Sequence, residues 1–257
     1  MILSTNYVSE MMSIDLPVAR VQRVRHEIKR RVLQVVRVEA VSPQFRSVTF
    51  SGESLADFVS ASFDDHVKFI LDGEGGEEVR RDYTPRRYDA AVGELTLEFA
   101  LHGDGPVANW AARATPGQSA TIAGPRGSFI IPMDYDWHLL IGDETAMPAI
   151  ARRLEELPAD ARVLVVLQVP EASERRNFHS AAAPKILWVQ DAVELLDTVR
   201  ALSLPAGEGY AWCAGEAGTM AALRQLLVEE KRHPSHAIRA AAYWKRGASA
   251  HHENLSA

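Results

Sequence analysis

Residues 137–145, WHLLIGDET, mark a change in the pattern of the chain. Residues 137–141 form an apolar run typical of a buried strand, and Gly142 opens a turn into a helix predicted at about 146–157. Alternating buried strands and helices predict a parallel sheet covered by helices on both faces. The further strands expected are 162–169, 186–190, 210–214 and 237–244, and the further helices are about 191–202 and 217–231.

Up to about residue 132 the chain follows a different pattern. Short β-branched or alternating segments are separated by turn-forming residues such as 72–76 (DGEGG), and one short helix is predicted at 107–114, with Pro106 in its first turn. Many short strands with turns between them predict a sandwich or a small barrel. The strands expected are 31–40, 45–50, 66–71, 81–84, 94–102 and 118–123.

These two patterns predict a β-barrel plus α/β fold, with an N-terminal antiparallel barrel followed by a parallel-sheet domain. We place the barrel domain at residues 20–133 and the α/β domain at 134–247, because the pattern changes near 132–136. Residues 1–19 are expected to be a flexible arm, and residues 248–257 a disordered tail.

The composition is that of a soluble globular protein with a substantial core. Of the 257 residues, 47% are hydrophobic and 24% are charged, and the formal net charge is −6. This balance argues against binding to nucleic acid or to anionic membranes, and no segment is long and apolar enough to cross a bilayer. The lone Cys213 excludes an internal disulfide. We therefore expect a cytoplasmic monomer with no metal site of its own.

Residues 81–86 (RDYTPR) have the side chains needed to bind a flat ligand that carries phosphate. Arg81 offers a guanidinium fork for phosphate, Tyr83 a stacking face, and Thr84 a short hydrogen bond to a ring heteroatom. Pro85 ends the strand, and Arg86 is expected as an exposed charge at the rim. The alternative is an edge strand with a solvated Arg81 and a half-buried Tyr83.

Two turns lie at the carboxyl ends of predicted parallel strands, at 142–145 (GDET) and 214–218 (AGEAG). Such turns can form a crevice for a nucleotide, because strand ends of a parallel sheet meet at one edge. Each turn could equally be a plain connection with a helix cap. A GxGxxG fingerprint is absent.

Residues 124–128 (GPRGS) place a cation between two glycines. The glycines let backbone amides approach a ligand, although a tight turn with an exposed Arg126 explains the pattern equally well. His66, His102 and Arg239 are single polar residues on apolar strands, where a lone histidine is more often structural than catalytic.

Five motifs in the same order resemble the siderophore-interacting proteins, which are FAD-dependent reductases of ferric siderophores in the ferredoxin-reductase superfamily. The resemblance extends from about Arg20 to Gly247. Its motifs are 64–68 (DDHVK), 81–86 (RDYTPR), 124–128 (GPRGS), 142–149 (GDETAMPA) and 240–245 (AAAYWK).

The resemblance implies roles for the residues that match its motifs. FAD would be held by Arg81, Tyr83, Thr84, His102, Gly105, Val107, Ala108, Trp110, Gly127 and Ser128. The pyridine nucleotide would face Asp143, Glu144, Thr145, Ala214, Gly215 and Glu216, with Tyr243 and Trp244 near the flavin. A basic pocket for the ferric siderophore would be formed by Lys68, Arg126, Arg239 and Lys245.

The expected reaction is reduction of Fe(III) to Fe(II) by FAD and NAD(P)H, which releases iron because hard oxygen donors hold Fe(II) less well. For the nucleotide we favour NADPH over NADH. Ser173, Arg175 and Arg176 could receive a 2′-phosphate, although Glu171 or Glu174 could instead accept a ribose hydroxyl. The alternatives are a general flavin reductase with another acceptor and a protein that binds ferric siderophore without reducing it.

Overall fold

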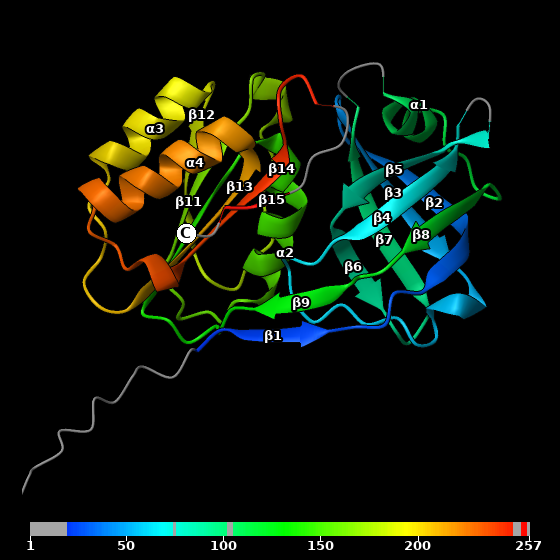
Figure 1. Cartoon of the computed structure of the whole chain (residues 1–257), viewed down its shortest axis with the longest axis horizontal. Coiled ribbons are helices and arrows are strands. Elements are labelled where there is room, and N and C mark those ends of the chain that lie inside the picture. The colour runs from blue at the N-terminus through cyan, green and yellow to red at the C-terminus, as the bar shows by residue number, and fades with distance from the viewer. Residues whose placement is uncertain (1–19, 74–75, 102–104, 249–252, 256–257) are drawn as a thin grey trace, which may run out of the picture.

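The computed structural model of the chain describes residues 20–73, 76–101, 105–248 and 253–255. Two large β-sheets lie side by side, with helix α2 (Met147–Glu156) between them (Figure 1). The predicted fold class is confirmed, because an antiparallel half-barrel comes first and a parallel sheet with helices follows. The predicted arm at 1–19 lies outside the described residues.

Seven antiparallel strands form the N-terminal half-barrel in the order β5-β4-β8-β2-β3-β7-β6. Its two edge strands, β5 and β6, follow each other in sequence with only Thr84 between them. The chain therefore passes from one edge of the sheet to the other at Thr84. The strands are β2 (Arg30–Ser42), β3 (Phe45–Ser51), β4 (Val67–Asp72), β5 (Glu78–Tyr83), β6 (Pro85–Asp89), β7 (Glu94–Ala100) and β8 (Ser119–Ala123).

The core of the half-barrel follows from the alternation in β7. Leu95, Leu97 and Phe99 point inward and are fully buried, where they join Phe50 and Phe69 in one apolar cluster. Helix α1 (Pro106–Ala112) packs its buried face against this cluster.

The second sheet has five parallel strands in the order β12-β11-β10-β13-β14. The order reverses between β10 and β13, so the carboxyl ends of these two strands form the switch point at which open α/β sheets bind ligands. The strands are β10 (Trp137–Gly142), β11 (Val163–Gln168), β12 (Lys185–Val189), β13 (Gly209–Glu216) and β14 (Ile238–Trp244).

Helices cover both faces of this sheet, as predicted. Leu140 lies in the core layer that contains α2, whereas its neighbours Leu139 and Ile141 lie in the opposite layer. That layer is shared with α3 (Ala192–Ala201) and α4 (Ala217–Gln225), and α4 continues as one wider turn, Leu226–Glu230. The apolar runs in the sequence reflect strands that are buried on both sides.

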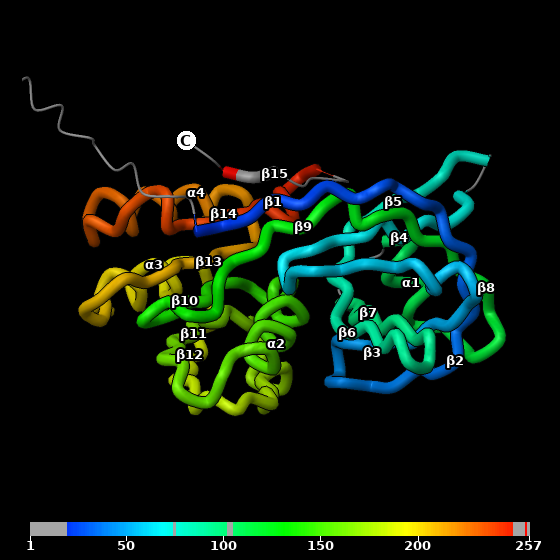
Figure 2. Tube along the Cα trace, turned by 90° about the horizontal axis from the view of Figure 1, so that it is seen from below, coloured from blue at the N-terminus to red at the C-terminus, as the bar shows by residue number. Residues whose placement is uncertain are grey.

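Four short strands were not predicted. One of them, β6, begins at Pro85, the residue that was expected to end a strand. β1 (Gln22–Arg25) pairs with β9 (Gly127–Ile130), and this ribbon runs along one side of the molecule past both sheets (Figure 2). β15 (Glu253–Asn254) pairs with β14 within the segment expected to be a disordered tail. The free edge of β14 provides the unpaired backbone groups that recruit this strand.

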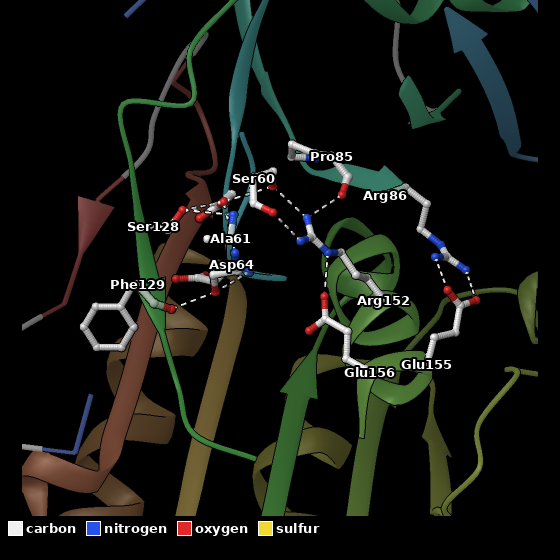
Figure 3. A network of polar contacts seen from close by, with 12 residues as sticks. Ser60, Ala61, Asp64, Pro85, Arg86, Ser128, Phe129, Arg152, Glu155 and Glu156 are labelled. Carbon is white, nitrogen blue, oxygen red and sulfur yellow. Dashed lines mark hydrogen bonds and ion pairs between the residues drawn. The ribbon is translucent and has the colours of Figure 1, made fainter. Parts of the chain in front are cut away.

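Helix α2 attaches the parallel sheet to the half-barrel through two arginine clusters (Figure 3). Arg152 donates to Ser60 Oγ at 2.8 Å and to the carbonyl oxygen of Pro85 at 2.9 Å. Arg86 makes two hydrogen bonds to the Glu155 carboxylate, at 2.8 and 2.5 Å. The expectation that Arg86 is an exposed rim charge is therefore wrong, since α2 places a carboxylate opposite it.

A buried ion pair makes a further contact between the halves. Asp64 of the barrel is only 4% exposed, accepts a hydrogen bond from Trp212 Nε1 at 3.0 Å, and pairs with Arg239 Nε of β14. Arg239 also lies over the Phe129 ring at 4.1 Å. A pair this buried is costly to break, because the remaining charge would have no partner.

We predict that Asp64→Asn lowers the free energy of unfolding by about 3 kcal/mol, since Arg239 would stay buried without its counter-ion. The matched control is Asp134→Asn, which breaks an ion pair with Arg20 at an aspartate side chain that is 79% exposed. We expect the control to cost less than about 1 kcal/mol. Equal losses in chemical denaturation would contradict the interpretation.

Candidate functional site

A cavity of about 390 Å³ lies between the half-barrel and the parallel sheet. Its lining combines the Arg81–Thr84 region, the start of α1, the turn after β10 and the end of β14. The structure thus brings together ten of the predicted residues, namely Lys68, Arg81, Tyr83, Thr84, Gly105, Val107, Ala108, Thr145, Tyr243 and Trp244.

The end of β5 presents three different groups at this cavity. Arg81 donates to the carbonyl oxygen of Arg80 at 2.9 Å, and no carboxylate within the described ranges pairs with it. The Tyr83 ring packs against Phe99 with 4.4 Å between centroids, and burial raises the pKa of its hydroxyl. Thr84 is buried at the point where the chain passes from edge strand β5 to edge strand β6. Arg81 is therefore available to an anion, whereas Tyr83 is also part of the core.

The residues around α1 divide into two groups. Gly105, Val107 and Ala108 line the cavity, and a Cβ at Gly105 would meet open space. Trp110 is partly buried and packs against the barrel core, where it stacks on Phe50 at 6.2 Å between centroids. His102, also predicted to bind FAD, lies outside the described residues.

Gly127 and Ser128 do not belong to the cavity lining. A Cβ at Gly127 would lie 2.4 Å from the carbonyl oxygen of Val24, so glycine is required there for β1 to pair with β9. Ser128 Oγ is buried and donates to Asp65 Oδ2 at 2.7 Å. Both residues therefore have a structural role in the fold: Gly127 allows the strand pairing, and Ser128 holds Asp65.

Asp143 organises the switch point between β10 and β13. Its Oδ1 accepts from Thr145 N at 3.0 Å, and its Oδ2 accepts from Glu216 N at 2.9 Å and from Trp244 Nε1 at 2.8 Å. Gly215 has a φ of +153°, and a Cβ there would lie 2.5 Å from Asp143 Oδ2. The two predicted turns are therefore joined by one buried carboxylate, which leaves Thr145 at the cavity.

Burial raises the pKa of Asp143, but a carboxylate that accepts this many hydrogen bonds is stabilised in its charged form. Burial, followed by the charge of Asp143, raises the pKa of Glu144 to about 7. Glu144 should therefore titrate near neutral pH.

Tyr243 and Trp244 close the cavity from the side of the parallel sheet. The Tyr243 hydroxyl is hydrogen-bonded to Thr84 and to Asp64, and burial raises its pKa well above the ordinary value. Trp244 is held by Asp143. Both aromatic residues are thus fixed by groups on the opposite wall or at the switch point.

The predicted basic pocket is not assembled as expected. Lys68 lines the cavity but pairs with Asp82 at 2.7 Å, and Arg239 is buried against Asp64. Arg126 and Lys245 are exposed and do not belong to the described lining. Sequence reasoning missed Asp82 because its effect depends on the β4–β5 register, which places it opposite Lys68.

Two residues of the loop after β11, residues 171–176, are bound to the half-barrel. Glu174 is buried and accepts hydrogen bonds from Ser42 Oγ and Gln44 N, so it is occupied by the barrel. Arg176 donates to Glu98 Oε2 at 2.7 Å. Glu171, Ser173 and Arg175 remain exposed.

Within the described ranges no group of histidine, cysteine and acidic side chains is arranged to hold a metal ion. The same part of the chain contains no helix with the length and apolar character needed to span a membrane.

The half-barrel and the parallel sheet with its switch point define a ferredoxin-reductase-like fold. The fold is shared with the ferredoxin reductase of carbazole 1,9a-dioxygenase, at a TM-score of 0.67 and 20% identity, covering 82% of this chain and 66% of that one. More specifically, residues 135–247 match the siderophore-interacting protein family, and residues 34–80 and 73–129 match its FAD-binding domain.

Individual relatives agree with this assignment. The chain is 34% identical to an NADPH-dependent ferric-chelate reductase of Escherichia coli, over 87% of this chain and 96% of that protein. It is 31% identical to a ferric vibriobactin reductase of Vibrio cholerae, over 87% and 93%. The structure of a siderophore utilization protein from T. fusca matches at a TM-score of 0.83 and 33% identity, covering 89% of this chain and 97% of that one. The chain belongs to the siderophore-interacting protein family.

The raised pKa of Glu144 predicts a pH-dependent stability. The stabilising proton is fully bound below about pH 4.5 and is lost as the pH rises through about 7. The free energy of unfolding should therefore fall by about 2 kcal/mol between pH 5 and pH 8 because of this group. Glu144→Gln should remove that loss in denaturation measured at both pH values, and an unchanged pH dependence would refute the assignment.

Proposed function

We propose that this protein reduces ferric siderophores in the cytoplasm, with FAD in the interdomain cavity and NADPH as the electron donor. The observation that carries the proposal is the convergence of Arg81, Thr84, Thr145 and Trp244 on one cavity. The family match and the reductases among the relatives support the same reaction. We assign FAD binding to residues 20–133 and nucleotide binding to residues 134–247.

The lining fits a flavin dinucleotide. Arg81 has no carboxylate partner among the described residues and suits the diphosphate, and Gly105 leaves open space beside α1. Tyr83, Tyr243 and Trp244 provide aromatic surface for a flat ring. Thr84 would hydrogen-bond the polar edge of that ring. FAD, when bound, accepts a hydride and passes electrons on singly, which side chains cannot do.

The nucleotide is proposed to enter at the switch point, where Thr145 borders the cavity. Of the groups considered for a 2′-phosphate, Ser173 and Arg175 remain exposed, while Arg176 is held by Glu98. Glu174, which could have bound a ribose hydroxyl, is occupied by Ser42 and Gln44. Glu171 stays exposed beside Ser173 and Arg175, so the choice of NADPH follows the name of the relative in Escherichia coli.

The net reaction converts one NADPH and two Fe(III) chelates into NADP⁺, one proton and two Fe(II). Hard oxygen donors bind Fe(II) less well than Fe(III), so reduction itself loosens the chelate. The protein therefore needs to bring the chelate near the flavin edge without supplying ligands to iron.

The test is to load the protein with FAD and record its visible spectrum without oxygen. NADPH should bleach the flavin faster than NADH, and a ferric siderophore should restore the absorbance with trapped Fe(II) appearing at two per NADPH. A protein that binds no FAD refutes the proposal. Bleaching by NADPH with reoxidation only by quinones would indicate a general flavin reductase, and chelate binding without bleaching a sequestering protein.

Arg81→Gln should weaken FAD binding by at least about tenfold, because a charge-assisted contact to the diphosphate is lost. The matched control is Arg80→Gln. Arg80 also lines the cavity, but it is already paired with Glu78 at 2.5 Å, so we expect less than about a threefold change. Titration of apoprotein with FAD measures both, and equal losses would contradict the role given to Arg81.

A further inference from the structure

Apart from Arg81, the lysine, arginine and acidic residues of the described cavity lining are joined in ion pairs. Lys68 Nζ donates to Asp82 Oδ2 at 2.7 Å, and the antiparallel register of β4 and β5 places the two residues directly opposite each other. The Asp82 side chain is 15% exposed and that of Lys68 is 49% exposed. The pair is therefore set by the backbone, and its carboxylate is the more shielded partner.

One oxygen of the Asp82 carboxylate takes no part in the contact with Lys68. Its Oδ1 is buried and has no hydrogen-bond donor among the residues that the structure describes. A carboxylate with one unsatisfied oxygen gains more from a nearby cation than a fully hydrogen-bonded one. The ion pair between Lys68 and Asp82 is therefore strengthened, because few other groups stabilise the carboxylate.

The other charged residues of the lining, Arg80 and Glu98, also form ion pairs. Arg80 donates twice to Glu78 Oε2, at 3.0 and 2.5 Å. Glu98 receives Arg176 at 2.7 Å and lies 3.2 Å from Arg86. Of the described lining cations, Arg81 alone has no carboxylate partner, and the proposed function assigns it to the FAD diphosphate. The FAD-loaded cavity is then left without an unpaired cation in its described lining.

We propose that Asp82 is a specificity-determining residue, which neutralises Lys68 and makes the cavity favour ferric chelates of low net charge over strongly anionic ones. This inference rests on the proposed function and names its substrate class. Three hydroxamates carry three negative charges and balance Fe(III), whereas three catecholates carry six and leave a trianion. A trianion that enters the cavity loses hydration, and no unpaired cation of the described lining replaces it once Arg81 holds the diphosphate, whereas a neutral chelate loses little.

Binding can be tested without electron transfer by using gallium(III), which has the charge of Fe(III) but is not reduced. Gallium tris(acetohydroxamate) is neutral and gallium tris(catecholate) is a trianion. Trp244 lines the cavity and reports occupancy by its fluorescence. With FAD-loaded protein, we expect the neutral complex to bind at least as tightly as the trianion. A preference for the trianion of more than about tenfold would overturn the proposal.

Asp82→Asn keeps the shape of the side chain and frees Lys68. The ratio of trianion to neutral affinity should rise by about fivefold or more, as Coulomb's law predicts for one unit of charge close to a trianion. The matched control, Glu39→Gln, makes the same change in net charge at a residue in a different cleft, and its ratio should stay within about twofold. Equal shifts in the two variants would show a bulk charge effect and overturn the assignment.

Lys68→Gln gives an independent test if Asp82→Asn folds poorly. It leaves Asp82 unopposed, so trianion affinity should fall by about fivefold while neutral affinity stays unchanged. Equal losses for both complexes would instead indicate a contact made regardless of charge and would refute the proposal. Reduction of the matching iron complexes tests the proposed function separately, since a protein that reduces both without charge preference refutes only the role of Asp82.

Discussion

The Asp64 carboxylate joins the two halves of the molecule beside the cavity. It lies in the loop before β4, yet its partners Trp212, Arg239 and Tyr243 all belong to the parallel sheet. Tyr243 in turn reaches Thr84, the residue at which the chain crosses the barrel edges. Because a buried charge must keep its partners, the position of the aromatic wall relative to the end of β5 depends on this one side chain.

The same kind of contact holds the other walls of the cavity in place. Arg152 and Arg86 hold α2 against the loop at Ser60 and against β6, and Asp143 holds Trp244 from the switch point. A site assembled from rigid elements holds a flat cofactor at a fixed distance from both electron donor and acceptor. In the proposed function, specificity for the acceptor is then left to the few charged side chains at the cavity.

The sequence predicts the fold well because the signals are local. Apolar runs such as 137–141 and the alternation of Leu95, Leu97 and Phe99 directly reflect burial on two faces or on one. The ion pairs between the halves could not be found in this way, since Asp64 and Arg239 are 175 residues apart. The partners of Arg86 and Arg239 are likewise distant in sequence. Gly127 has the pattern of a ligand-binding glycine, but in the structure it accommodates β1.

A crystal structure of the protein with bound FAD tests the central claim most directly. The account predicts density for the isoalloxazine ring between Thr84 and the pair Tyr243 and Trp244, with the diphosphate against Arg81 and the Asp64–Arg239 ion pair unbroken. A flavin bound elsewhere, or in this cavity only after the two halves separate and that ion pair opens, would contradict it.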